Sequence, residues 1–207
     1  MMPATVSAEL PSPDRALMTL ARDGEREARE ELARRVRRPA YLLALQLTGR
    51  PDLAHDIAQD SLLRFFQHLD RFDPERPVEP WLYQIVRNRV RDVRRRERLR
   101  RMESLDAWRE QGRPETIDAS ADPSRDAERS ELQRRIWSAI SEMSEAHREI
   151  LVLRDYHDLA YREIAEVLSI PQGTVMSRLH AARKSLREIL SADPEFGGPI
   201  ARQEGRN

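Results

Sequence analysis

The sequence predicts an all-α protein: two small helical domains joined by a flexible acidic linker, the C-terminal one containing a helix-turn-helix. Apolar residues recur at helical spacing along most of the chain. Only 5% of the 207 residues are aromatic and 35% are charged, which is typical of thin helical bundles rather than one thick core. The balance of charge also reverses, because residues 87–101 hold nine Arg against two acidic residues, and residues 102–132 hold nine acidic residues against four Arg.

The first domain is predicted over residues 14–101, after a proline-containing flexible N-terminus over residues 1–13. A short helix is expected to end at Gly24, and a second helix, bent or restarted at Pro39, to end at Gly49, before Pro51. A third helix is expected over 52–69; Phe65 and Phe66 lie in it, and two neighbouring rings cannot both face the core. A stiff loop with three prolines then leads to a long helix that starts at Trp81 and becomes strongly basic.

Residues 102–130 are predicted to be the linker, because apolar residues are sparse and Gly and Pro interrupt any helix. The second domain is expected over 131–190, followed by a flexible tail over 191–207. Ser144 is a candidate N-cap within this domain.

Two short helices joined by a breaker cluster, Ser169-Ile170-Pro171-Gln172-Gly173, are predicted within residues 158–187. Thr174 is the expected N-cap of the second of these helices. Its apolar stripe consists of Val175, Leu179, Ala182 and Leu186. The opposite face is polar and basic, and such a helix held against a supporting helix fits the major groove of DNA. A helical hairpin with a merely solvated basic face is the simpler alternative.

Several classes are disfavoured by composition. There is no Cys, so the chain has no disulfide and no thiolate metal site, which fits a reducing, cytoplasmic location. No apolar run has the length of a membrane span, so no membrane insertion is expected. The net charge is zero and does not indicate a partner.

Three blocks in this order resemble the extracytoplasmic-function (ECF) class of bacterial sigma factors, the kind with regions 2 and 4 only. The first block is Asp52 to Leu62, DLAHDIAQDSL, similar to the acidic helix that docks on the polymerase β′ clamp. The second is Leu69 to Phe72 with Pro80 to Asn88, similar to the segment that melts and reads the −10 element. The third is Ile164 to His180, similar to the hairpin that reads the −35 element, although Ser169 stands where Gly is common.

The resemblance implies a transcription initiation factor with no catalytic residues, no cofactor and no metal. Its partners are core RNA polymerase (the β′ clamp and the β flap), promoter DNA and an anti-sigma factor. The implied core-polymerase-binding residues are Asp56, Gln59, Asp60 and Leu63. Those for −10 DNA are Phe72, Asp73, Pro74, Arg87, Asn88, Arg91 and Arg95. Those for −35 DNA are Gln172, Thr174, Ser177, Arg178, His180, Arg183 and Lys184.

Parts of the sequence also fit two other classes of function. One is a helix-turn-helix regulator that acts without being a polymerase subunit. The other is a His-Asp metal phosphohydrolase, suggested by the pairs His55-Asp56 and His157-Asp158. That enzyme needs a further His upstream of the pair and a distant Asp. No His precedes His55, and although His147 and Asp193 are in the right order around His157-Asp158, Asp193 falls in the predicted tail.

Overall fold

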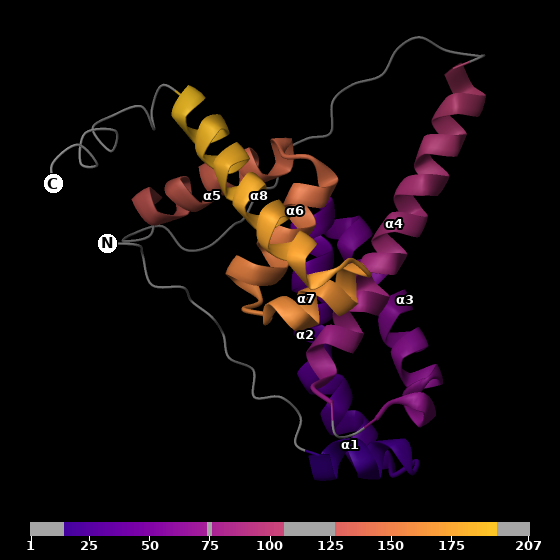
Figure 1. The fold of residues 1–207 in the computed structure, drawn as a ribbon. Coiled ribbons are helices and arrows are strands. Elements are labelled where there is room, and N and C mark those ends of the chain that lie inside the picture. The colour runs from indigo at the N-terminus through magenta and orange to yellow at the C-terminus, as the bar shows by residue number, and fades with distance from the viewer. Residues whose placement is uncertain (1–14, 74–75, 106–126, 194–207) are drawn as a thin grey trace, which may run out of the picture.

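The structure is a computed structural model that describes residues 15–73, 76–105 and 127–193 (Figure 1). All the regular structure in these three ranges is helical, as predicted. The first domain contains α1 (Arg15–Arg22), α2 (Arg26–Thr48), α3 (Pro51–Gln67), a short 3₁₀ turn (Leu69–Arg71) and α4 (Val78–Leu105). The second contains α5 (Ala127–Glu142), α6 (Glu145–Leu151), a π-helical turn (Val152–Tyr156), α7 (Tyr161–Leu168) and α8 (Gln172–Ala192).

The junction between α2 and α3 forms as its sequence predicts. Gly49 adopts the left-handed conformation (φ 70°), and its N–H donates to the carbonyl of Leu45 at 2.7 Å. Only glycine enters this conformation without steric cost, which explains why α2 ends there. Pro51 then occupies the first turn of α3, where its missing N–H is of no consequence.

Helix α2 itself runs without interruption through Pro39, which is buried in the core. The helix does not restart there.

The core of the first domain lies between α2, α3 and α4. Leu32, Leu43, Ile57 and Leu82 are buried there together with Phe65. The ring of Phe65 lies 4.6 Å from that of Trp81 in α4 and packs edge-on against Phe66. Phe65 is fully buried and Phe66 only partly, as expected for neighbouring positions on a helix.

Helix α4 is longer than the sequence predicts at both ends. It begins at Val78 rather than Trp81, so Pro80 lies in its first turn, where proline is tolerated. Its C-terminal half projects beyond the other helices (Figure 1) and continues to Leu105. Since α5 begins at Ala127, the predicted linker is helical at both of its ends, and residues 106–126 lie outside the described residues.

The second domain begins with the predicted cap. The hydroxyl of Ser144 accepts a hydrogen bond from the N–H of His147 at 3.4 Å, which confirms Ser144 as the N-cap of α6. Beyond α6 the chain widens into the π-helical turn, where the N–H of His157 donates to the carbonyl of Val152, five residues back.

The helix-turn-helix consists of α7 and α8. Ser169 ends α7 in the left-handed conformation (φ 55°, ψ 48°), and the N–H of Ile170 donates to Ala165 at 3.0 Å. The predicted N-cap of α8 is wrong, because Pro171 occupies that position and offers no side-chain cap. Thr174 lies in the first turn instead, and its N–H donates to the carbonyl of Pro171. Extended Pro171 can precede a helix but not continue one, so α8 begins directly after it.

We expect the substitution Ser169→Gly to raise the free energy of unfolding by about 0.5–1 kcal/mol, because Ser169 is held at positive φ without being glycine. Urea denaturation followed by circular dichroism measures the change. Ser177→Gly, inside α8, is the matched control and should lower stability by about the same amount. Equal effects of the two substitutions would contradict the strain assigned to Ser169.

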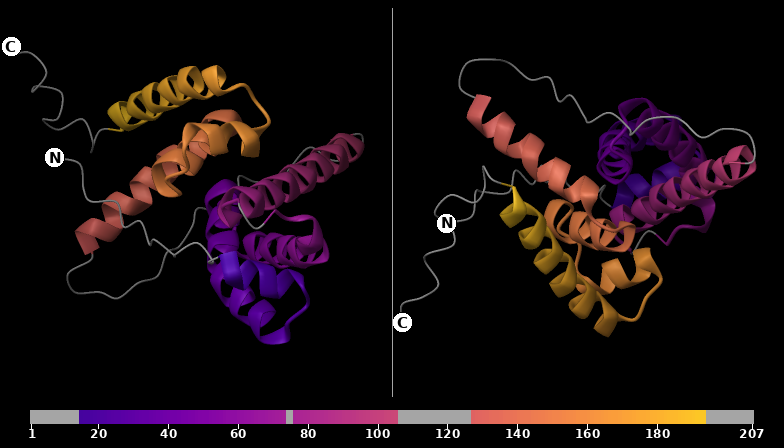
Figure 2. Two further views of the ribbon diagram at one scale, coloured as in Figure 1. Left: turned by 60° about the horizontal axis from the view of Figure 1, so that its bottom comes forward. Right: turned by 90° about the horizontal axis from the view of Figure 1, so that it is seen from above.

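The two domains pack against each other (Figure 2). Helix α7 lies on α4, and the π-helical turn reaches α2. The interface brings together polar side chains that lie 51 to 111 residues apart in the sequence.

Candidate functional site

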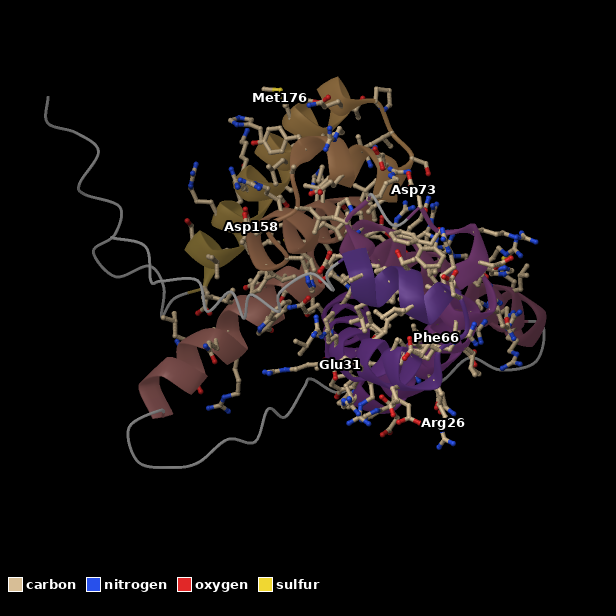
Figure 3. The ribbon with its side chains drawn as sticks, turned by 90° about the horizontal axis from the view of Figure 1, so that it is seen from below. Arg26, Glu31, Phe66, Asp73, Asp158 and Met176 are labelled. Carbon is tan, nitrogen blue, oxygen red and sulfur yellow. The ribbon has the colours of Figure 1, made fainter. Side chains whose placement is uncertain are left out.

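Helix α8 presents a polar face to solvent along its N-terminal half. Its apolar stripe is confirmed: Val175, Leu179 and Ala182 are buried and Leu186 is partly buried. Met176 lies at the outer edge of the molecule, beside the turn that enters α8 (Figure 3). The predicted −35 residues all lie outside the core: Gln172, Ser177, His180, Arg183 and Lys184 are exposed, and Thr174 and Arg178 are partly buried.

Part of the positive charge of this face is paired within the domain. Arg183 contacts the carboxylate of Asp155 through Nε at 3.2 Å and through Nη2, and this hydrogen bond raises the pKa of Arg183. Lys184 lies 3.8 Å from Glu188, one turn further along α8. Arg178 and His180 lie closer to the start of α8 than these two paired cations.

The predicted polymerase-binding residues form one face of α3, with the spacing i, i+3, i+4 and i+7. Asp56 and Gln59 are exposed, and Leu63 is an exposed apolar side chain at 56%. Asp60 differs from its neighbours because Arg89 of α4 donates to its Oδ2 through Nε at 2.9 Å. This face is acidic, with the apolar side chain of Leu63 at its C-terminal end. Asp60 also connects α3 to α4 through its hydrogen bond with Arg89.

The predicted −10 residues are divided between solvent and core. Asn88, Arg91 and Arg95 are exposed on α4, and Asp73 is exposed in the loop before it (Figure 3). Pro74 lies outside the described residues. Phe72 is only 7% exposed, with its ring stacked on that of Trp81 at 4.8 Å.

Arg87 is the member of this group that the structure withdraws from solvent, since it is only 6% exposed. Its Nε donates to Oε2 of Glu149 in α6 at 2.9 Å, and its Nη1 donates to the carbonyl of Val167 at 3.1 Å. Glu149 is itself 5% exposed, so the two domains share a buried ion pair. In this arrangement Arg87 does not face solvent and is not placed to contact DNA.

A second charged contact lies further along α4. Arg94 donates to Glu145 of α6 at 2.6 Å and also to the carbonyl of Leu47, at the end of α2. Arg148 donates to the same carbonyl at 3.2 Å. Burial, and then the positive charge of Arg94, lower the pKa of Arg148.

His157 joins the domains through both ring nitrogens. Nδ1 lies 2.9 Å from the hydroxyl of Tyr83, and Nε2 lies 2.7 Å from Oε1 of Gln46. Burial lowers the pKa of His157 to about 4 and raises that of Tyr83, so both are neutral at pH 7. The Tyr83 hydroxyl then donates to Nδ1, and the Nε2 hydrogen is donated to Gln46.

This geometry weakens the phosphohydrolase alternative. Both nitrogens of His157 are engaged in hydrogen bonds, with Tyr83 and Gln46, and are not free to bind a metal ion in this arrangement.

We expect His157 to make the protein less stable as the pH falls from 6.5 towards 4. The unfolded chain binds a proton at a pKa of about 6.5, whereas the folded value is about 4, so the contribution is complete above pH 6.5 and decreases below it. The slope is at most about 1.4 kcal/mol per pH unit. Urea denaturation between pH 7 and 5 measures it, a range above that in which carboxylates titrate.

His157→Gln is the control for this experiment, because it removes the titrating ring. The variant should lose that part of the slope, whatever its absolute stability. Identical slopes for the two proteins over this range would show that His157 is not buried in the neutral form.

In the described part of the chain, no helix is both long enough and apolar enough to span a bilayer.

Comparison with known proteins agrees with the division into two domains. Residues 32–100 match the family described as "Sigma-70 region 2", and residues 133–186 match "Sigma-70, region 4". The ECF RNA polymerase sigma factor SigL of Mycobacterium tuberculosis is 34% identical over 151 residues, covering 71% of this chain and 80% of SigL. The RNA polymerase sigma factor CnrH of Cupriavidus metallidurans is 31% identical over 187 residues, covering 88% and 96% of the two chains.

Solved structures show the same fold. CnrH, in complex with the cytosolic domain of CnrY, superposes with a TM-score of 0.63 at 27% identity, over 87% of this chain and 98% of CnrH. The sigma factor RpoE of Bartonella quintana, in complex with the anti-sigma factor NepR, gives 0.62 at 22% identity over 79% of this chain and 97% of RpoE, and supports the fold alone. This chain belongs to the ECF sigma factors of bacterial RNA polymerase, which are transcription initiation factors and not enzymes.

Proposed function

We propose that this sigma factor divides its work among three surfaces: α3 binds core polymerase, α4 with the loop before it engages the −10 element, and α8 reads the −35 element. The observation that carries the proposal is the exposed polar face of α8, fixed in direction by the buried stripe Val175, Leu179 and Ala182. A helix held in this way can enter a major groove so that the side chains of its polar face point towards the base pairs. The factor would act in the cytoplasm, where the polymerase works.

On α8, the polar side chains of the first turns are assigned to base edges and the cations to phosphates. Gln172, Thr174 and Ser177 supply hydrogen-bonding groups near the start of the helix. The cations assigned to phosphates are Arg178, Arg183 and Lys184, and His180 is assigned to the same DNA-facing surface.

On α3, the face formed by Asp56, Gln59, Asp60 and Leu63 is assigned to the β′ clamp. Acidic groups around an apolar side chain provide both orientation and buried area at an interface. The second domain is assigned to the β flap, as the family relationship suggests.

On α4, exposed Asn88, Arg91 and Arg95 are assigned to DNA near the −10 element. The loop at Phe72, Asp73 and Pro74 is assigned to a flipped base. Holding an extruded base offsets part of the cost of unstacking it. Arg87 joins this surface only in an arrangement that exposes it.

A protein partner is proposed as well. The solved structures of CnrH and RpoE are complexes, with the cytosolic domain of CnrY and with the anti-sigma factor NepR respectively. The likeness to CnrH, over 98% of its chain, supports a protein partner for this sigma factor, and we assign that role to an anti-sigma factor.

Run-off transcription with core polymerase tests the proposal, and Arg178→Ala is the informative variant. We expect about tenfold less transcript from a promoter that depends on its −35 element, since one DNA-contacting cation is lost. Co-purification with core polymerase should be unchanged. Arg187→Ala, an exposed cation about two turns further along α8, is the control and should have little effect. An unaltered −35 footprint for Arg178→Ala would rule out α8 as the reader.

A further inference from the structure

The basic stripe of α4 is occupied by carboxylates of the second domain. Arg87, Arg91, Arg94 and Arg98 follow one another at spacings of four, three and four residues, so they share one face of the helix. Glu149 pairs with Arg87 and Glu145 with Arg94, and the two carboxylates lie one turn apart on α6. We call these four pairing residues, Arg87, Arg94, Glu145 and Glu149, the α4–α6 charge contact.

Three of the four arginines of the stripe, Arg91, Arg94 and Arg98, influence the pKa of Glu145. Its partial burial acts to raise its pKa, but the hydrogen bond from Arg94 and the charges of Arg94, Arg91 and Arg98 lower the pKa below its ordinary value. A carboxylate in this position accepts from guanidinium groups as a phosphate oxygen does.

Further contacts seal the same interface without involving the stripe. His157 joins Tyr83 to Gln46, and Arg148 reaches the carbonyl of Leu47. Arg76, just before α4, pairs with Glu166 of α7. The closed arrangement is therefore held at several points. Of these, only the α4–α6 charge contact engages Arg87, which is proposed to meet −10 DNA, together with Arg94 on the same basic stripe.

The charge contact is also incompletely satisfied, which makes it displaceable. Oε1 of Glu149 is buried, and among the described residues it has no hydrogen-bond partner. A buried ion pair returns little net stability for the desolvation of its two charges. Arg94 and Arg148 share one carbonyl, and the positive charge of Arg94 lowers the pKa of Arg148.

We propose that α6 is an intramolecular competitor of DNA: Glu145 and Glu149 occupy the arginines of α4 until a nucleic-acid phosphate backbone replaces them and the two domains separate. This inference rests on the proposed function of α4 as the −10 DNA surface. It adds that the closed chain withholds Arg87 and Arg94 from DNA, and that opening the domains and binding DNA are one equilibrium.

The distance between the domains is the first measurement. The chain has no Cys, so Arg26→Cys and Arg187→Cys place one spin label on an exposed site in each domain of the full-length protein. Double electron–electron resonance then reports closed and open populations. Adding a short single-stranded DNA to this otherwise unaltered protein should shift the distribution to longer distances. An unchanged distribution at saturating DNA would overturn the proposal.

The second measurement uses Glu145→Gln with Glu149→Gln, which removes both charges but preserves size. We expect a larger open population without DNA, and about tenfold tighter binding of the single-stranded DNA at constant salt, because less of the protein is closed. The matched control is Glu27→Gln with Glu142→Gln, two exposed acids elsewhere. It changes the net charge equally and should alter neither quantity.

Arg91→Ala separates failure of this inference from failure of the proposed function. Arg91 is exposed on the stripe and should contribute to DNA binding in either case. If Arg91→Ala weakens binding while the Gln pair changes neither distance nor affinity, α4 binds DNA and the competition is wrong. If the Gln pair opens the protein, yet affinity stays constant and Arg91→Ala has no effect, the proposed role of α4 fails, and the inference fails with it.

Discussion

Replacing Asp56 with Arg is expected to reduce the affinity for core RNA polymerase by about a hundredfold or more. Asp56 is exposed at the N-terminal end of the face of α3 that is assigned to the β′ clamp. Reversing a charge at an interface replaces an attraction by a repulsion, and like charges brought together there cost several kcal/mol. Since the side chain lies in solvent, the free energy of unfolding should hardly change. Competition binding to purified core polymerase measures the effect.

Asp60 should behave differently from Asp56, although both are acidic residues of the same face. Its carboxylate accepts from Arg89, whose side chain is 15% exposed, so Asp60→Arg would place two positive charges together between α3 and α4. We therefore expect Asp60→Arg to lose stability as well as binding. Glu27→Arg, an exposed acid on α2, is the control for Asp56→Arg. Undiminished binding by Asp56→Arg would remove α3 from the polymerase interface.

Replacing Phe65 with Ala is expected to lower the free energy of unfolding by about 3–5 kcal/mol. Phe65 has 0% exposure, and its ring contacts both Phe66 in α3 and Trp81 in α4. The substitution removes this ring and leaves a cavity where α3 and α4 meet, and the surrounding helices can fill it only in part. Urea denaturation followed by circular dichroism measures the loss.

Phe66→Ala is the natural comparison, because it removes the same side chain from the next residue of α3. Phe66 is partly exposed, so we expect a smaller loss of stability. Equal losses for the two variants would contradict the orientation of α3 on α4.

The elements that local sequence determines were predicted well. The apolar stripe of α8, the Ser144 cap and the Gly49–Pro51 junction each depend on residues within a few positions of one another. The predicted N-cap of α8 was wrong because extended Pro171 occupies the N-cap position, three residues before Thr174, and the helix begins directly after it at Gln172.

The contacts between the domains were not predicted, because they join residues that are distant in sequence. Arg87 is one of nine arginines in a short run, and composition does not tell which of them faces inward. A signal was nevertheless present: Tyr83, Arg87, Val90 and Arg94 follow one another at spacings of four, three and four residues, so Arg87 shares a face with buried side chains. What the pattern cannot supply is Glu149, the partner from beyond the linker.

The π-helical turn at Val152–Tyr156 sets the rotational phase of His157. An α-helix advances by about 100° per residue, so one additional residue in a turn redirects every side chain that follows. In this protein the π-helical turn ends immediately before the histidine that bonds Gln46 and Tyr83. Shortening the segment by one residue would leave a regular helix but turn the imidazole away from both partners. The π-helical turn thus orients the His157 ring towards its two partners in the first domain.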